Sequence, residues 1–330
     1  MKGARVTASF IDCSHQGAIR LAQCAPELRR DIVVHHGDPT AELVIERARG
    51  AAVLLDGDSV IDAPTIRTLA SDLRSIVFLG TGAGSYIDLE TAAECGIPVR
   101  VVHGYGDRTI AEHTFALLLA ASRRIAITDR AIRAGGWPRE QGIELDGKTL
   151  GVIGLGGVGR HVASMARAFG LRVIAWNRRH RDPPSGVELA PLDAVVAQSD
   201  VITLHVALTD ETRHLFDHHR IAQMRPGAIL INTARGALVE ESALVDALRD
   251  QRIGHAALDV YHDEPLPAGS ALRGLENVTL TSHIAWDSPA ASARLFESAL
   301  GKVQRDLARL RAGEDLIDDH NATRGKIDPD

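Results

Sequence analysis

Three glycines in the middle of the chain, spaced as G-x-G-x-x-G within KTLGVIGLGGVGR (148–160), constrain the fold more than any other feature. An apolar stretch before them predicts a buried strand, and a helical apolar pattern follows, formed by Val162, Met165, Ala166 and Phe169. In such a unit Gly154 permits a tight turn, Gly156 lets a pyrophosphate approach the backbone, and Gly159 lets the helix pack on the strand. The helix also points free N–H groups at the phosphates. We therefore predict a dinucleotide-binding turn made by Gly154, Gly156, Gly157, Val158 and Gly159; the alternative is a glycine-rich turn without a ligand.

Apolar runs alternate with helical patterns along the rest of the chain, which is typical of parallel sheets covered by helices on both faces. Before the glycine turn, strands are predicted at Arg5–Phe10, Ile32–His35, Ala51–Leu55, Ser75–Leu79 and Val99–Val102. After it, they are predicted at Leu171–Trp176, Asp200–His205, Ala228–Asn232, His255–Val260 and Val278–Thr281. The predicted fold class is therefore α/β, with two doubly wound parallel-sheet domains.

Two predicted helices mark the ends of the domains. The first covers Thr109–Ala126 and begins with a T-x-x-E capping box formed by Thr109 and Glu112. The second begins at Ser288-Pro289, an N-cap followed by proline at the first helical position, and carries the chain back to the first domain. We therefore predict a discontinuous domain of residues 1–108 and 290–330, with residues 109–289 inserted as a second domain.

Composition and charge argue against several classes of protein. The 330 residues suffice for two domains with separate cores. A net charge of −6 without a long basic run argues against nucleic acid or an anionic membrane as the partner. The longest apolar run, Phe115–Ala121, is far shorter than the ~20 residues of a membrane span. The N-terminal sequence does not resemble a signal peptide, and the three cysteines form no metal or redox motif, so we expect a cytoplasmic protein with reduced thiols.

A second glycine-rich loop, Gly80-Thr81-Gly82-Ala83-Gly84, follows the strand predicted at 75–79. Open α/β sheets bind ligands beyond the carboxyl ends of their strands. We interpret this loop as a nest of backbone N–H groups for a small anion, with a flexible connection as the alternative.

Three polar residues follow three consecutive strands of the second predicted sheet. Arg235 follows GAILINTA, Glu264 follows HAALDVYHD, and His283 follows NVTLTS. These strand ends face the region where a nicotinamide would lie, and hydride transfer needs a cation for the substrate and a group that exchanges a proton. Arginine suits the first role and histidine the second, with a carboxylate beside the histidine as support. Each residue alone also has a structural explanation: a surface ion pair, a turn, or packing.

From about Ile76 onward the chain resembles the D-2-hydroxyacid dehydrogenase family, the group of D-glycerate, hydroxypyruvate/glyoxylate and phosphoglycerate dehydrogenases. The matching stretches are IDLETAAECGIPV, AEHTFALLLA, GKTLGVIGLGGVGR, DVITLHVALTDETRHLF, MRPGAILINTARGALVEESALVDAL, ALDVYHDEP and SHIAW. The resemblance implies a flavodoxin-like substrate domain made from both chain ends, with a Rossmann cofactor domain inserted and the active site in the cleft. It also implies a homodimer formed through the cofactor domain.

The resemblance assigns roles to individual residues. Arg235 would bind the substrate, Glu264 would assist, and His283 would be the acid/base. Asp259 would hold the carboxamide of the coenzyme, and Thr109 and the carbonyl of Thr233 or Ala234 would lie near the coenzyme. The substrate carboxylate would receive N–H groups from the loop of Gly80, Thr81, Gly82 and Ala83. A 2-keto acid bound in this way would accept a hydride on its carbonyl carbon and a proton from His283.

Three departures from the family pattern bear on the ligands. The common H-x-P beside the adenine is His205-Val206-Ala207 here, and the glycines of the GTGAG loop are offset by one position. The acidic residue that usually binds the ribose 2′-hydroxyl is replaced by Asn177, which Arg178 and Arg179 follow. A carboxylate would repel a 2′-phosphate, whereas these residues would bind one. We therefore predict that NADP(H) is preferred; NAD(H) is the alternative if both arginines point to solvent.

Trp286 would place a large ring near the substrate, and the chain ends before a regulatory domain. Both features favour a small substrate such as glyoxylate or hydroxypyruvate over phosphoglycerate, although Trp286 would also fit simple packing against the C-terminal helix.

Formate dehydrogenase shares the implied fold, but the pair of Glu264 and His283 argues against it. The non-enzymatic alternative is a nucleotide-sensing corepressor of the same fold. No metal is expected.

Overall fold

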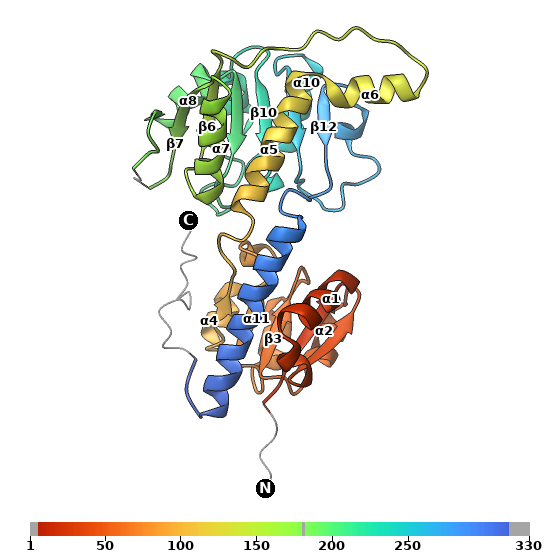
Figure 1. Cartoon of the computed structure of the whole chain (residues 1–330), viewed down its shortest axis with the longest axis vertical. Coiled ribbons are helices and arrows are strands. Elements are labelled where there is room, and N and C mark those ends of the chain that lie inside the picture. The colour runs from red at the N-terminus through yellow and green to blue at the C-terminus, as the bar shows by residue number, and fades with distance from the viewer. Residues whose placement is uncertain (1–5, 180–181, 317–330) are drawn as a thin grey trace. The chain divides into compact units, whose positions relative to one another are not determined.

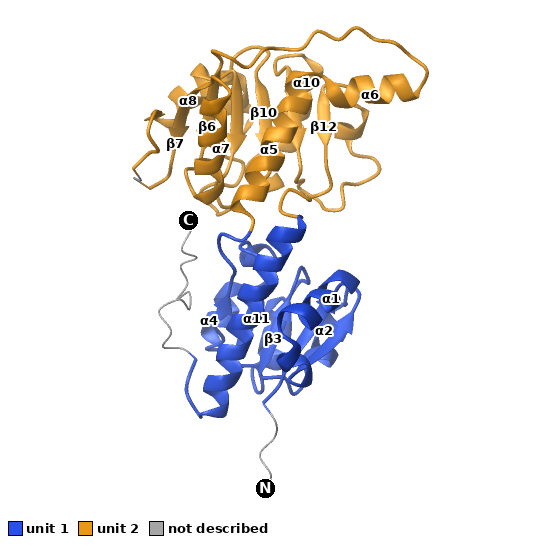
Figure 2. Cartoon of the chain, viewed as in Figure 1, with its two compact units in different colours: residues 1–105, 288–329 blue, residues 106–287, 330 orange. Residues whose placement is uncertain are grey.

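The computed structural model describes residues 6–179 and 182–316, which form two compact units (Figure 2). Unit 1 contains the chain up to Tyr105 and from Ser288 onward, and unit 2 contains Gly106–Asp287. These limits lie near the predicted boundaries at 108/109 and 289/290, and the functional assignment of the two units stays a prediction. Arg5 and the last ten residues lie outside the described part of the chain.

The described strands of unit 1 form a five-stranded parallel sheet in the order β2-β1-β3-β4-β5. They are β1 (Ala8–Cys13), β2 (Ile32–His36), β3 (Val53–Asp56), β4 (Ser75–Phe78) and β5 (Val99–Arg100). This is the flavodoxin-like order, so the predicted fold class is confirmed for this unit. The first strand was predicted too early, at residues 5–10, because its run of buried side chains extends to Cys13.

Helices cover both faces of this sheet. The helical segments of unit 1 are α1 (His15–Cys24), η1 (Pro26–Arg30), α2 (Ala41–Ala48), α3 (Ala63–Leu69), η2 (Ala83–Ser85), α4 (Leu89–Glu94) and α11 (Pro289–Arg311). The predicted start of α11 is confirmed, since Ser288 Oγ accepts the Ala291 N–H at 3.2 Å and proline follows the cap. Helix α11 packs against α1, β3 and β4. The two chain segments of unit 1 therefore share one core.

A buried ion pair fixes α11 to the sheet of unit 1. Arg100 on β5 donates through Nε to Asp306 Oδ2 at 2.7 Å, and the Ser75 hydroxyl donates to the same oxygen at 2.7 Å. The two charged side chains are only 6% and 3% exposed. Since breaking a buried ion pair is costly, this contact holds the C-terminal helix in place.

The described strands of unit 2 form a seven-stranded parallel sheet in the order β12-β11-β10-β9-β6-β7-β8. They are β6 (Thr149–Ile153), β7 (Arg172–Trp176), β8 (Val187–Leu189), β9 (Val201–Leu204), β10 (Ile229–Asn232), β11 (His255–Leu258) and β12 (Val278–Leu280). Counted from β6, this is the Rossmann order with one further strand, which confirms the predicted fold class for unit 2 as well. The strand order reverses between β6 and β9.

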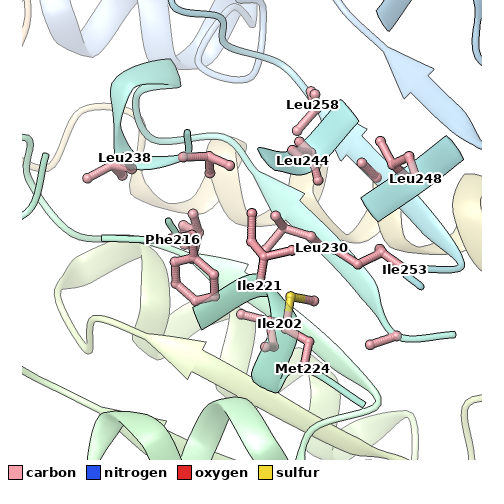
Figure 3. Close-up of a cluster of buried hydrophobic side chains, with 14 of the residues drawn as sticks. Ile202, Phe216, Ile221, Met224, Leu230, Leu238, Leu244, Leu248, Ile253 and Leu258 are labelled. Carbon is pink, nitrogen blue, oxygen red and sulfur yellow. The ribbon is translucent and has the colours of Figure 1, made fainter. Parts of the chain in front are cut away.

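Two helical layers cover this sheet (Figure 1). The side chains of its strands alternate between the two layers. The helical segments of unit 2 are α5 (Asp107–Ser122), α6 (Ile125–Arg133), α7 (Gly157–Ala168), α8 (Leu192–Gln198), α9 (His218–Gln223), η3 (Gly236–Leu238), α10 (Glu241–Arg249) and η4 (Ala271–Gly274). On β10, Ile229 and Ile231 face the cluster with α5 and α7, whereas Leu230 faces the cluster with α8, α9 and α10 (Figure 3). This alternation follows from the two-residue period of a strand.

Two local predictions in unit 2 were wrong, and one strand was missed. Helix α5 begins at Asp107 with Gly106 as its N-cap, so Thr109 forms no capping box, and Glu112 pairs with Arg108 at 3.1 Å instead. The helix ends at Ser122, because Arg124 adopts a left-handed φ of 58°, and a separate helix, α6, follows. Strand β8 was not predicted, since it is a three-residue edge strand with two exposed side chains.

Candidate active site at the strand ends of unit 2

The glycine turn lies where the strand order of unit 2 reverses, directly after β6. Gly154 has a φ of +104°, and a Cβ there would lie 2.5 Å from the carbonyl oxygen of His205. A Cβ on Gly159 would lie 1.9 Å from the carbonyl oxygen of Gly154, so α7 packs directly on the turn. Gly156 is the N-cap of α7 and supplies no side-chain cap to its N–H groups. This backbone cradle fits the pyrophosphate of a dinucleotide.

Asn177 lies against the glycine turn, at the end of β7. Its Oδ1 accepts the Leu155 N–H at 2.9 Å, and its Nδ2 donates to the Arg179 carbonyl oxygen at 2.5 Å. Arg178 pairs with the exposed carboxylate of Glu211 at 3.1 Å. The structure therefore brings Asn177 to the glycine turn, where it also has the structural task of holding the backbone of the turn.

His205 directly follows β9, on the other side of the reversal point. Its Nε2 lies 2.9 Å from the Thr203 hydroxyl, and burial lowers the pKa of its imidazole to about 3. The ring is therefore neutral at ordinary pH and acts as a hydrogen-bonding group.

Arg235, Glu264 and His283 follow β10, β11 and β12, which are neighbours in the parallel sheet. The carboxyl ends of parallel strands lie at one edge of a sheet, so the strand-end pattern in the sequence predicts this arrangement. Asn232 positions the first of these residues: its Nδ2 donates to the Arg235 carbonyl oxygen at 2.8 Å and its Oδ1 accepts the Ala234 N–H at 3.0 Å. A Cβ on Gly236 would lie 1.9 Å from the Tyr261 carbonyl carbon, so the turn after Arg235 packs against the backbone beyond β11.

Glu264 and His283 form a direct pair. Nδ1 of His283 lies 2.6 Å from Oε2 of Glu264, while Oε1 accepts the Tyr261 N–H at 2.8 Å. Burial raises the pKa of the Glu264 carboxyl, but the hydrogen bonds from His283 and Tyr261 and the charges of His283 and Arg235 outweigh it and hold the pKa below its usual value. The carboxylate is therefore ionised near neutral pH. It fixes one imidazole nitrogen and leaves Nε2 for a reacting group.

A buried carboxylate, Asp259, organises the loop that carries His283. Its two oxygens accept the Ile284 N–H at 3.0 Å, the Ala285 N–H at 2.9 Å and the Thr281 hydroxyl at 2.6 Å. His283 has a φ of +55°, which costs ~1–3 kcal/mol for a residue other than glycine, and its N–H donates to the Asp259 carbonyl oxygen at 2.8 Å. Asp259 is 0% exposed, and the hydrogen bonds that it accepts hold this strained loop in place.

His113, on helix α5, joins this buried network and was missed in the sequence. Its Nε2 lies 3.1 Å from the Thr281 hydroxyl and 3.5 Å from Asp259 Oδ1. In the sequence it belongs to the apolar helical stretch AEHTFALLLA, where a histidine is ordinarily a packed side chain. Only its position relative to Asp259, far away in the sequence, identifies it as a support for the loop of His283.

The remaining predicted residues occupy several places. Thr109 lies in the first turn of α5, and the Thr233 hydroxyl lies 3.0 Å from that of Thr114. The Ala234 carbonyl oxygen accepts a hydrogen bond from the Arg235 guanidinium at 2.7 Å. Trp286 lies in the loop after His283 and is partly exposed.

The second glycine-rich loop belongs to unit 1 and follows β4. The Gly80 N–H already donates to the Phe78 carbonyl oxygen at 3.0 Å. In the described part of this loop, the N–H groups of Thr81, Gly82 and Ala83 donate to no protein acceptor. These three groups, rather than Gly80, are the ones that an anion would engage.

The strand ends of unit 2 thus combine a guanidinium, an ionised carboxylate paired with an imidazole, and a cradle for a dinucleotide. The combination suits hydride transfer to a carbonyl whose oxygen takes up a proton. Within residues 6–179 and 182–316, no helix is long and apolar enough to cross a membrane, and no group of three or more His, Cys, Asp and Glu side chains could hold a metal ion.

Comparison with known proteins gives matches over most of the chain. Residues 115–285 match the family described as D-isomer specific 2-hydroxyacid dehydrogenase, NAD binding domain. A glyoxylate reductase of Aeropyrum pernix is 38% identical over 75% of this chain and 77% of that protein. A D-3-phosphoglycerate dehydrogenase of Archaeoglobus fulgidus is 39% identical over 86% of this chain, which spans only 54% of that protein. The crystal structure of a glyoxylate reductase from Paecilomyes thermophila covers 95% of this chain and 98% of its own, with a TM-score of 0.84 at 28% identity.

Proposed function

This chain belongs to the D-isomer specific 2-hydroxyacid dehydrogenase family of NAD(P)-dependent oxidoreductases, and from that premise we propose that it reduces a small 2-keto acid to the D-2-hydroxy acid. The observation that carries the proposal is the 2.6 Å contact between His283 Nδ1 and Glu264 Oε2, at the sheet edge that also presents Arg235 and the glycine turn. A proton donor held in this way beside a dinucleotide cradle suits carbonyl reduction better than any process without proton transfer.

In the proposed reaction, bound NAD(P)H supplies the hydride. The Arg235 guanidinium binds and polarises the keto acid, since its planar fork matches a carboxylate. His283, protonated and held at Nδ1 by Glu264, donates the Nε2 proton to the carbonyl oxygen as the carbon accepts the hydride. Oxidation of the hydroxy acid is the reverse, with His283 as the base. Asp259 would be a positioning residue that also reaches the coenzyme carboxamide only if it exchanges one of its present partners.

We propose glyoxylate or hydroxypyruvate as the class of substrate. The Aeropyrum and Paecilomyes relatives are named for glyoxylate. The partly exposed ring of Trp286, in the loop after His283, also favours a small keto acid. Phosphoglycerate is the second candidate, because the Archaeoglobus relative is a D-3-phosphoglycerate dehydrogenase. The contact of the substrate carboxylate with the N–H groups of Thr81, Gly82 and Ala83 stays a prediction.

We propose NADP(H) as the preferred coenzyme. Asn177 leaves no carboxylate at the end of β7 to repel a 2′-phosphate, and Arg178 and Arg179 follow it. Arg178 would exchange its exposed partner, Glu211, for the phosphate.

Three free thiols suit the cytoplasm, which is the location that we propose.

A panel of 2-keto acids assayed in parallel with NADPH and NADH tests both proposals. We expect the highest kcat/KM with glyoxylate or hydroxypyruvate, and a higher value with NADPH than with NADH. Asn177→Asp keeps the oxygen that accepts the Leu155 N–H but adds a charge, so it should lower kcat/KM for NADPH relative to NADH about tenfold, or ~1.4 kcal/mol.

The matched control for Asn177→Asp is Arg172→Gln on the same strand, which breaks an exposed ion pair with Glu188. It should leave the ratio of the two coenzymes unchanged. A wild-type preference for NADH would contradict the coenzyme proposal, and the absence of turnover with every keto acid despite tight nucleotide binding would favour the corepressor alternative.

We propose a homodimer in which a second copy of unit 2 covers helix α6 and the segment after it. In the described chain α6 has no buried residue, and it extends away from the sheet of unit 2 (Figure 1). Exposed apolar side chains gather there: Ile125 (52% exposed), Ile132 (47%), Trp137 (82%) and Ile143 (39%). A second copy of unit 2 would remove these exposed apolar side chains from water.

Light scattering is expected to give twice the chain mass of 35.4 kDa for the wild type. Ile132→Asp combined with Trp137→Glu should give the monomer mass, because the new charges would be buried without partners. Val60→Asp, at an equally exposed apolar position in unit 1 (66% exposed), is the control and should remain a dimer. A monomeric wild type, or an unchanged mass in the double variant, would contradict this interface.

A further inference from the structure

Asp107, the first residue of α5, lies directly against the start of α7. A Cβ added to Gly157, the first residue of α7, would fall 1.8 Å from Asp107 Oδ2 and 3.2 Å from Oδ1. Helices α5 and α7 pack side by side on one face of the unit 2 sheet (Figure 1). The carboxylate of one helix therefore packs against the first residue of the other, in the space that a side chain at Gly157 would fill.

The start of α7 has no anion of its own. Its first turn contains no acidic residue, and its N-cap, Gly156, makes no side-chain hydrogen bond. The first N–H groups of a helix lack partners within the helix, and the helix dipole makes this end positive. Asp107 thus supplies, from a neighbouring helix, the negative charge that the sequence of α7 lacks.

The same place must receive the coenzyme. The pyrophosphate of a dinucleotide lies on the glycine turn at the N-terminus of the following helix, and Gly157 belongs to both. We propose that the Asp107 carboxylate is an internal competitor of the coenzyme: it neutralises the start of α7 in the coenzyme-free chain and is displaced when the pyrophosphate binds. Two anions at this helix end repel each other, so Asp107 weakens coenzyme binding and speeds coenzyme release.

The inference rests on the coenzyme assignment but makes a separate prediction, because the pyrophosphate is common to NAD⁺ and NADP⁺. Replacing Asp107 by the isosteric, uncharged asparagine should tighten the binding of both coenzymes, and of ADP-ribose, by the same factor. Asn177 and its arginines, in contrast, should affect only the ligand that carries a 2′-phosphate.

The experiment is a calorimetric titration of the full chain, as wild type and Asp107→Asn, with NADP⁺, NAD⁺ and ADP-ribose. We expect all three dissociation constants to fall about tenfold in the variant, in line with the strength of a charge at a helix terminus, and the dissociation rate of NADPH to slow by a similar factor. The control is Glu112→Gln, which removes a charge from an exposed position on the same helix (57% exposed) and should leave all three constants unchanged.

Thermal unfolding provides the second readout. Without ligand, Asp107→Asn should melt below the wild type, since the start of α7 loses its counter-charge; with saturating NADP⁺ the difference should shrink or reverse. A purely structural role would lower both melting temperatures equally and leave the dissociation constants unchanged, and a role as a ribose ligand would weaken binding. Either result would overturn the inference. A wild type that binds no dinucleotide would contradict the coenzyme assignment as well, whereas equal affinities in wild type and variant contradict only the role of Asp107.

Discussion

Replacement of His283 by asparagine is expected to lower turnover of 2-keto acids by ~10²–10⁴-fold, the usual contribution of a positioned general acid. Asparagine can still accept the left-handed backbone conformation of this residue (φ of +55°), so the loop should keep its shape. The variant loses the group that donates a proton at the carbonyl oxygen, but it keeps the glycine turn. Steady-state kinetics should therefore show a fall in kcat with little change in coenzyme affinity.

The same assay can distinguish the role of Glu264 from that of His283. Because its Oε2 contacts His283 Nδ1 at 2.6 Å, the carboxylate acts through the imidazole. Adding Glu264→Gln to His283→Asn should then cost little further activity, although Glu264→Gln alone should lower kcat. His219→Asn on helix α9 serves as the control and should remain active. A His283→Asn variant with near wild-type kcat would show that another group protonates the substrate.

Asp306→Ala is expected to lower the free energy of unfolding of unit 1 by ~3–5 kcal/mol, because it removes the buried carboxylate that pairs with the Arg100 guanidinium at 2.7 Å. The Ser75 hydroxyl would lose its acceptor as well. Urea unfolding followed by circular dichroism measures the loss. Hydrogen exchange should locate it in α11, the helix that the pair attaches to the sheet.

Two further variants identify the cause of that loss. Glu94→Ala breaks an exposed ion pair with Arg67 in the same unit and should cost less than about 1 kcal/mol. Replacing both partners, Arg100→Met with Asp306→Leu, should restore much of the stability, since both buried charges are then replaced by apolar side chains. If Asp306→Ala were as mild as Glu94→Ala, the pair would not hold α11.

The sequence predicted the elements whose ends carry a local chemical marker. The glycine turn predicted β6 and α7, and Ser288 with Pro289 predicted the start of α11. Elements without such a marker were misplaced or missed. The break between α5 and α6 depends on a left-handed arginine, Arg124, rather than on glycine or proline, and β8 is too short and exposed to show a strand pattern.

The candidate site likewise contains some residues that the sequence predicted and others that it missed. Strand ends in a parallel sheet share an edge, so the order of strands in the sequence was enough to place Arg235, Glu264 and His283 there. His113 and Asp107 were missed because the residues that they lie against, Asp259 and Gly157, come from other elements. A contact between residues distant in the sequence leaves no periodic pattern, so only the folded chain reveals it.

In the proposed reaction, a hydride passes from a nicotinamide to the carbonyl carbon of a keto acid and gives the D-2-hydroxy acid. The most direct test uses coenzyme deuterated at the transferable C4 position together with hydroxypyruvate, followed by mass spectrometry and chiral analysis of the product. We expect D-glycerate with one deuterium on C2. Product without deuterium at C2, or L-glycerate, would contradict it.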